Sequence, residues 1–438
     1  MEVPTTGERR GGDRIGALPD GVLEDILGFL PAQDAVRTCV LARRWRHLWK
    51  SAKALRVVGG DGKFPWSVKE LREFVDYLLL SRGGAPLDTF ELNFRGFSDE
   101  ELPSLNIWLR YAVTCKARVL RLRLRNNFEV EGFHDLPKLD GLPLVSKHLT
   151  RLELHGVEVY TSFPNFSSCP VLEHLEFNKC EFSLVKKILS DSIKHLNITE
   201  SISGFYDSFR TRICAPNLVS LHLDEVYGWT PVLETMASLV EAFVRIPELC
   251  LDQCEQWHAN YWDCDCKSCD KHDNSANGHD SCVLLKGLSE AKKLTLFSYP
   301  LMYIFKRDLR CCPTFSKLKT LLLNKYWPEP DSLHALACIL EHSPVLEKLT
   351  LQLFLEVPKY AEEMKGSPDP EELSAAISEY EFFRCLILVL KLHDEGAQFL
   401  YLRDLFNHSR THKFNVHVSN GLGYCPRKFS VNSDTFIY

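Results

Sequence analysis

A short apolar pattern, leucine-x-x-leucine-x-leucine with other apolar residues allowed, recurs along most of this chain and constrains its fold more than any other feature. The first positions of ten copies are residues 87, 119, 149, 172, 193, 218, 239, 291, 318 and 346. Successive copies are 21 to 32 residues apart, except for one step of 52 residues that equals two steps of 26. Unrelated amphipathic strands would not keep this spacing, so the chain is built from repeats.

Steps of this length are typical of a leucine-rich repeat, in which each copy adds one strand to a parallel sheet. We therefore expect an α/β solenoid over residues 87–356, with the leucines in a continuous core and the residues between them on a concave face. That face is the natural surface for a protein substrate, although an unused polar face would show the same pattern. The candidate substrate-facing residues are Arg121, Arg123, Arg151, Glu153, His174, Glu176, His195, Asn197 and His222.

The segment before the repeats, residues 14–50, is predicted to form three short helices. Leu23, Ile26, Leu27 and Leu30 have the spacing of one apolar helix face. A unit of about forty residues cannot bury so many large apolar groups by itself. Either the rest of the chain or a partner must therefore cover the remaining apolar surface.

Residues 14–50 closely resemble the F-box, and the sequence RTCVLARRWRHLW near their end is similar to the plant variety that precedes leucine-rich repeats. The resemblance implies that this segment docks on a Skp-type adaptor and thereby joins a cullin-based ubiquitin ligase. It also implies that Trp45, Leu48 and Trp49 are partly internal. The adaptor contacts that the resemblance implies are Leu18, Pro19, Ile26, Leu27, Leu30, Pro31, Val36 and Val40.

The wide step between repeats contains a Cys- and Asp-rich insertion, residues 250–282. Cys266 and Cys269 have the spacing of half a zinc site, but no second pair stands at a matching distance. A solvated hydrophilic loop explains the same composition. We therefore assign no metal ligand and no cofactor, and a zinc- or redox-responsive role for this insertion stays an alternative.

The remaining segments are less specific. Residues 1–13 read as a disordered leader, and residues 51–86 as a linker or N-terminal cap of the repeats. Residues 357–438 begin like the FBD region that closes many plant F-box proteins and continue as an atypical tail.

Composition and motifs exclude several functional classes. The net charge of −6 argues against a general nucleic-acid or anionic-lipid surface. No apolar stretch approaches the roughly 20 residues of a membrane span, and the N-terminal residues lack the apolar region of a signal peptide, so we expect a nuclear or cytoplasmic protein. No nucleotide, nucleophile-elbow or metalloprotease motif is present, which argues against an enzyme. The sequence thus favours a substrate-recognition subunit of a Skp–cullin–F-box (SCF) ubiquitin ligase, and the alternative is a repeat scaffold without a ligase role.

Overall fold

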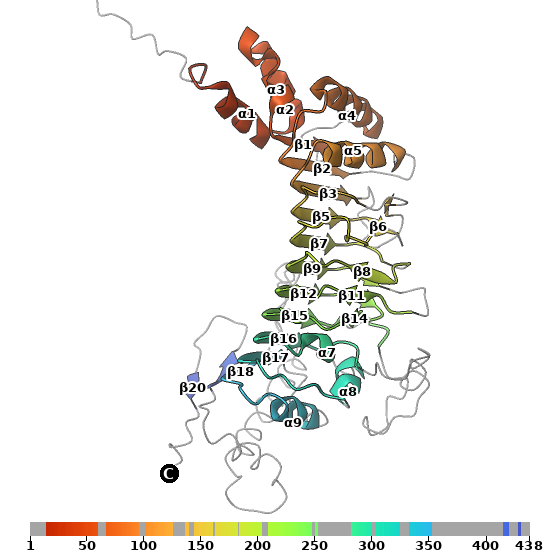
Figure 1. The fold of residues 1–438 in the computed structure, drawn as a ribbon, viewed down its shortest axis with the longest axis vertical. Helices are drawn as coiled ribbons and strands as arrows, with labels where there is room; N and C mark the ends of the chain where they lie inside the picture. Colours follow the sequence, from red (N-terminus) through yellow and green to blue (C-terminus); the bar gives the residue numbers. More distant parts are fainter. Residues whose placement is uncertain are drawn as a thin grey trace, which may run out of the picture. The chain divides into compact units, whose positions relative to one another are not determined.

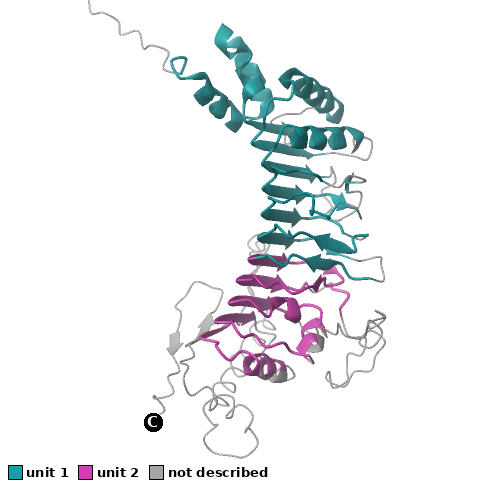
Figure 2. Cartoon of the chain, viewed as in Figure 1, with its two compact units in different colours: residues 1–218 teal, residues 219–438 magenta. Residues whose placement is uncertain are grey.

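The computed structural model describes residues 15–59, 67–95, 102–125, 136–139, 144–160, 163–182, 184–203, 209–247, 250–252, 282–298, 303–309, 311–324, 333–352, 415–419 and 428–430. Figure 1 labels its helices and strands, and Figure 2 distinguishes two compact units, residues 1–218 and 219–438. The predicted leader 1–13 and most of the predicted insertion 250–282 lie outside the described residues, as does most of 357–438.

Unit 1 begins with short helices. They are α1 (Asp20–Phe29), α2 (Ala32–Arg37), the 3₁₀ turns η1 (Thr38–Val40) and η2 (Arg43–Arg46), and α3 (Leu48–Ser51). Helix α1 ends at Phe29 because Leu30 is extended, as residues before a proline usually are. Pro31 then precedes α2, where its missing N–H costs the helix nothing.

The sheet of unit 1 is parallel throughout, in the order β1-β2-β3-β5-β7-β9. These strands are β1 (Ala54–Gly59), β2 (Thr89–Arg95), β3 (Val119–Arg125), β5 (Arg151–His155), β7 (His174–Asn178) and β9 (His195–Thr199). The repeated strands were predicted to begin at residue 87, but β1 lies within the segment predicted as a linker or cap. The sheet therefore begins one strand earlier than the sequence pattern indicated.

The return segments of unit 1 differ with repeat length. The long steps before β2 and β3 contain α4 (Val68–Arg82) and α5 (Leu102–Thr114), which lie on the same side of the sheet in Figure 1. Helix α4 begins with a capping box between Ser67 and Glu70 and is capped at its C-terminus by Gly83, whose φ of 58° is left-handed. The described later returns use short strands instead: β4 (Lys138–Leu139), β6 (Glu158–Val159), β8 (Lys187–Leu189), β10 (Ile202–Ser203) and β11 (Arg212–Cys214). All of these except β4, which precedes β5 in a step of 30 residues, lie in steps of 21 to 25 residues.

Unit 2 continues the strand-and-return pattern. Its parallel strands are β12 (Ser220–Asp224), β15 (Glu241–Arg245), β16 (Lys293–Phe297), β17 (Thr320–Asn324), β18 (Lys348–Gln352) and β19 (Asn415–Ser419), followed by antiparallel β20 (Lys428–Ser430). The other elements are β13 (Tyr227–Gly228), β14 (Val232–Leu233), α7 (Leu285–Leu288), α8 (Tyr303–Leu309) and α9 (Leu333–Glu341). In neither unit is a described helix long and apolar enough to cross a bilayer.

The 52-residue step was interpreted as two repeats of 26, and that interpretation is wrong. Strand β15 pairs directly with β16, and Ala242 lies beside Leu294 in the register. Had a second repeat been present, its strand would separate these two. The step is therefore one repeat that carries an insertion.

The core of each unit lies beneath the sheet, where the repeated apolar residues are buried as predicted. One copy is shifted by two residues. Strand register places Leu120 beside Phe90 and Leu152, so this copy is Ala117, Leu120 and Leu122. Val119, which was predicted to begin the copy, is only half-buried and lies on the open face.

Candidate functional site

The inner face of the F-box helices packs against the first strand of the sheet. Leu23 and Leu27 are almost completely buried, and a Cβ added at Gly28 would lie 3.2 Å from the Cβ of Ala54. Leu27 was predicted to contact the adaptor, but a buried side chain offers no surface to a partner. That assignment is corrected: Leu27 belongs to the interior of unit 1.

Hydrogen bonds fix these helices on the repeats. The Arg56 Nε donates to the carbonyl oxygen of Gly28 at 3.0 Å, and buried Arg82 donates to the carbonyl oxygens of Trp49 at 3.1 Å and Ala52 at 2.8 Å. Burial of the Arg82 guanidinium lowers its pKa, and these two carbonyls compensate part of the desolvation. The F-box and the first repeats therefore share one core.

The outer face of the same helices remains apolar and open. Val22, Ile26 and Phe29 on α1, with Val40 and Leu41 beyond α2, have exposed fractions between 39% and 82%. Large exposed apolar patches of this kind mark interaction surfaces. We call these five residues the apolar F-box face.

The predicted adaptor contacts other than Leu27 are accessible. Pro19, Ile26 and Val40 are exposed, and the half-buried residues are Leu18, Leu30, Pro31 and Val36. Sequence reasoning missed Val22, Phe29 and Leu41. The sequence does contain a signal for this face, because Val22, Ile26 and Phe29 have helical spacing. The same helix has a second apolar stripe with Leu23 and Leu27, and this stripe faces inward.

Arg44 holds the loop that leads into this face. Its Nε donates to the Asp20 carboxylate at 2.7 Å, and its other nitrogens donate to the carbonyl oxygens of Gly16 and Leu18. A single guanidinium thus connects η2 to the start of α1 and fixes how Leu18 and Pro19 are presented.

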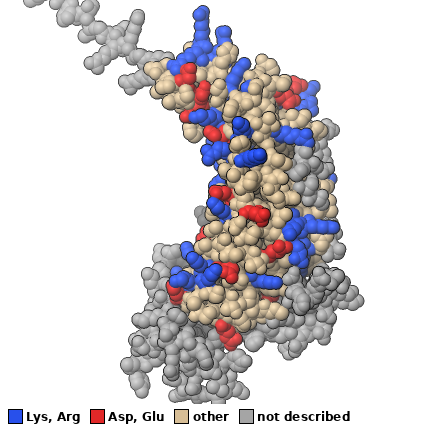
Figure 3. All heavy atoms as spheres, in the orientation of Figure 1, with Lys and Arg blue, Asp and Glu red and all other residues tan. Residues whose placement is uncertain are grey.

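A second surface is the open face of the sheet in unit 1, where basic side chains outnumber acidic ones. Strands β1 to β9 place six arginines and three glutamates on this face, which leaves a surplus of three positive charges in a chain whose net charge is −6. Basic and acidic side chains also lie close together on the surface in Figure 3. The members of this arginine face are Arg56, Arg95, Arg121, Arg123, Arg125, Arg151, Glu91, Glu153 and Glu176.

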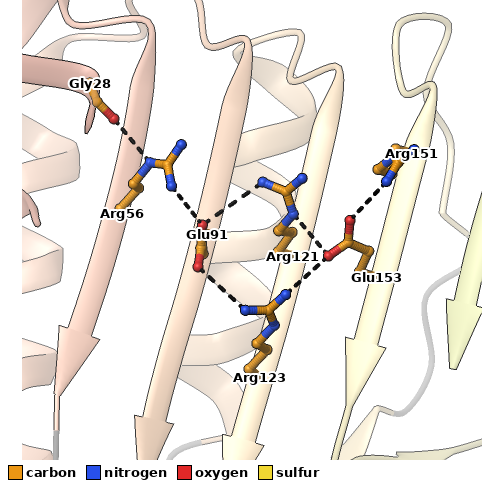
Figure 4. A network of polar contacts seen from close by, with 7 residues as sticks. All are labelled: Gly28, Arg56, Glu91, Arg121, Arg123, Arg151 and Glu153. Atoms are coloured by element: carbon orange, nitrogen blue, oxygen red, sulfur yellow. Dashed lines mark hydrogen bonds and ion pairs between the residues drawn. The ribbon is translucent and has the colours of Figure 1, made fainter. Parts of the chain in front are cut away.

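Glu153 on β5 is the centre of the arginine face (Figure 4). Its carboxylate lies 2.8 Å from Arg121 Nε, 3.4 Å from Arg123 Nη2 and 3.4 Å from Arg151 Nη1. The Glu153 side chain is largely buried beneath these three, whereas Arg123 and Arg151 remain open to solvent. One buried negative charge therefore orients three guanidinium groups without neutralising them.

Glu91 on β2 repeats this arrangement one strand earlier. Its carboxylate is 3.4 Å from Arg56 Nη1, 3.9 Å from Arg121 Nη1 and 4.0 Å from Arg123 Nη1. Arg56 also holds the carbonyl oxygen of Gly28, so the ladder of ion pairs begins at the F-box. Alternation of charge across neighbouring strands is the favourable arrangement for a sheet.

Histidines on the same face respond to this positive surplus. Burial, with the nearby charges of Arg125, Lys179 and Arg123, lowers the pKa of His155 to about 4. Burial and the charge of Arg151 also lower the pKa of His174, whose ring stacks on His195 with centroids 4.5 Å apart. His155 is thus neutral at pH 7, which a positive potential on this face favours.

Most of the predicted substrate-facing residues lie on the open face of unit 1, and one lies in unit 2. Arg121, Arg123, Arg151 and Glu153 form one network, and the polar side chains of β7 and β9 continue their rows: His174 with His195, and Glu176 with Asn197. His222 lies in unit 2.

Sequence reasoning missed Arg56 and Glu91. Both occupy the position between the last two apolar residues of their repeat, which is also the position of Arg121 and Glu153. The sequence pattern began the third-strand copy at Val119 instead of Ala117, and this two-residue error hid the shared position of the four residues.

The open face of unit 2 is aromatic. Phe243 on β15 stacks on His222 with centroids 4.4 Å apart and meets Phe297 edge-on at 5.5 Å. The Arg245 guanidinium lies 5.5 Å from both phenyl rings, and its Nε is 3.1 Å from the Asp224 carboxylate. This face offers stacking and apolar contact in place of surplus charge.

Comparisons with known proteins agree with both parts of this architecture. The F-box domain matches residues 15–56. An F-box/LRR-repeat protein of Arabidopsis thaliana is 30% identical over 267 residues, which cover 53% of this chain and 68% of the relative. An F-box/FBD/LRR-repeat protein of the same plant is 27% identical over 83% of this chain and 84% of its own length.

A meiotic F-box protein of Oryza sativa subsp. japonica is 27% identical over 77% of this chain and 71% of its own length. No solved structure matches the chain. The helical module on the first strand, the repeated parallel strands and these relatives lead to one conclusion: the chain belongs to the F-box/LRR-repeat proteins known from plants.

Proposed function

We propose that this protein is the substrate-recognition subunit of an SCF ubiquitin ligase. The observation that carries the proposal is the apolar F-box face, which stays open although the opposite side of α1 is buried against the sheet. An adaptor of the Skp type is the partner that an F-box implies, and it would cover Ile26, Phe29 and Val40. The cullin would then be reached through that adaptor.

The target is proposed to bind on the arginine face through an acidic segment. Arg123 and Arg151 are oriented by Glu153 yet open to solvent, and Arg95 and Arg125 are exposed at the ends of β2 and β3. Complementary charge steers encounter and discriminates among partners. Because the F-box and this face belong to the same compact unit, adaptor and target would be held on one body.

The proposed role involves no bond chemistry in this chain. The receptor raises the effective concentration of a target lysine near the ligase, which is a positioning function. We also propose a nuclear or cytoplasmic location. The cysteines of the described residues are free thiols, which suits a reducing compartment.

The test is adaptor binding by an Ile26→Ala, Phe29→Ala double variant, measured by titration calorimetry with a purified Skp-type adaptor. Truncated interface hot spots typically cost about 1–4 kcal/mol each, so we expect roughly a hundredfold loss of affinity or more. Leu80→Ala on α4 is the matched control, because Leu80 is 81% exposed yet lies outside the F-box. The circular dichroism spectrum should be unchanged in both variants.

Unchanged adaptor affinity in the double variant would refute the proposed docking face. If the wild-type chain itself does not bind the adaptor, the repeat scaffold without a ligase role becomes the better account. Loss of affinity in Leu80→Ala as well would mean that the effect is not specific to the F-box.

A further inference from the structure

Two cysteines and a histidine meet in unit 2, away from both surfaces described above. One ligand atom from each of Cys312, Cys338 and His342 can be chosen so that all three lie within 4.8 Å of one another. The Cys338 Sγ and His342 Nδ1 atoms are 4.0 Å apart. We propose that these three residues bind a zinc ion, with water at the fourth position.

The ligand chemistry favours zinc. Thiolate and imidazole are the ligands that zinc prefers, and three protein ligands with one open position are an established zinc arrangement. Tetrahedral Zn–S and Zn–N bonds of about 2.3 and 2.0 Å imply sulfur-to-nitrogen separations of roughly 3.5 Å. The 4.0 Å separation between Cys338 Sγ and His342 Nδ1 needs a small contraction to reach that value, and zinc at Nδ1 would replace the 2.8 Å contact of this nitrogen with the Cys338 carbonyl oxygen.

The backbone already holds the three residues in place. Cys338 is in the last turns of α9, and His342 directly follows the end of this helix, about one turn after Cys338. The His342 N–H donates to the Cys338 carbonyl oxygen at 3.2 Å, and the His342 carbonyl oxygen accepts from the Phe315 N–H at 2.7 Å. This second bond joins the end of α9 to the segment that contains Cys312. The geometry therefore does not depend on flexible side chains alone.

The thiols make weak hydrogen bonds in the absence of an ion. Cys312 Sγ donates to the carbonyl oxygen of Pro313 at 3.6 Å, and Cys338 Sγ donates to that of Leu309 at 3.6 Å. Both side chains, and that of His342, are half-buried, so an ion can reach them without unfolding. Zinc would link the segment before β17 to the end of α9 and so close one complete repeat.

The proposed site lies apart from the insertion whose cysteines suggested zinc in the sequence. Cys266 and Cys269 fall outside the described residues, so the test must separate the two. Bound zinc is measured by mass spectrometry of the purified full-length chain after dialysis against metal-free buffer. We expect Cys338→Ser and His342→Ala each to lose one zinc per chain relative to the wild type. Cys311→Ser, a neighbouring exposed cysteine, is the matched control and should lose none.

A second measurement needs no variant and so does not depend on whether one folds. The wild-type chain is alkylated with iodoacetamide, with and without zinc, and its peptides are mapped. Zinc should slow alkylation of Cys312 and Cys338 roughly tenfold or more, because a metal-bound thiolate is shielded, and should leave Cys311 unchanged. Equal alkylation with and without zinc would overturn the proposal, as would full zinc retention by both variants.

Discussion

The open faces of the two units are made by the same kind of strand but are stabilised in different ways. In unit 1, Glu91 and Glu153 lie beneath arginines that reach across neighbouring strands. In unit 2, Phe243 occupies the equivalent repeat position and contacts a histidine and a second phenylalanine. The repeat fixes where outward-facing side chains stand, and the residue types alone decide whether a face recognises charge or apolar surface.

The difference also affects how each face responds to its surroundings. Ion pairs open to solvent are screened by salt, whereas a buried glutamate that holds three arginines is screened much less. Stacked rings are almost insensitive to salt. Substitutions that change charge, and changes in salt concentration, should therefore affect unit 1 more than unit 2.

The largest difference is expected when one carboxylate is removed from each face. Glu153→Gln leaves three arginines without their buried partner and should lower the free energy of unfolding by about 3 kcal/mol. Asp224→Asn is the matched change in unit 2, where the pair with Arg245 is more exposed, and should cost less than about 1 kcal/mol. Urea unfolding followed by circular dichroism measures both. Equal losses would show that the ladder is no stronger than an ordinary surface pair.

Charge reversal at the edge of the arginine face should weaken acidic-ligand binding without disturbing the ladder. Arg95→Glu with Arg125→Glu should lower affinity for a fluorescent Glu-rich peptide by roughly 30-fold, about 2 kcal/mol, in low salt. The control Lys69→Glu with Arg110→Glu changes the net charge equally on α4 and α5. Fluorescence anisotropy gives the affinities. A Gln-rich peptide that binds equally well would contradict an acidic target.

An effect of similar size on the free energy of unfolding is expected from pH. The pKa of His155 is about 4 in the folded chain and about 6.5 when unfolded, so the unfolded state binds more protons between these values. The contribution of His155 to the free energy of unfolding is fully present above pH 6.5 and is lost as the pH falls toward 4. The loss amounts to about 2 kcal/mol after allowance for partial exposure of the ring. His155→Gln should therefore narrow the difference in unfolding free energy between pH 7 and pH 5. An unchanged pH dependence would exclude His155 as its source.

The smallest effect is expected in unit 2. Phe243→Ala removes contacts with His222 and Phe297 on a half-buried face and should cost about 1 kcal/mol. The loss should be the same in low and high salt, in contrast to the peptide binding of unit 1. Thermal unfolding at two salt concentrations provides the measurement. A strongly salt-dependent loss would mean that the Arg245–Asp224 pair, not the rings, stabilises this face.

Much of the architecture could be predicted because its signals are local. Alternation of apolar and polar residues determines which side of a strand is buried, and this is why Leu175, Leu221 and Leu294 lie in the core as expected. The F-box helices likewise follow from helical spacing and from Pro31. The predictions that were wrong depend on which strands and helices pack against each other. They are the start of the repeat copy at Val119, the double repeat at the 52-residue step, and the orientation of Leu27.

The sequence by itself determined that this chain is an F-box followed by repeated strands, since periodicity and proline positions act within a few residues. Only the tertiary structure decided that Val22 and Phe29 face outward, because the place of α1 on β1 selects one of its two apolar stripes. It also decided which arginines contact Glu153. That pairing depends on register between repeats of unequal length, and hydrophobic burial sets this register through contacts distant in the chain.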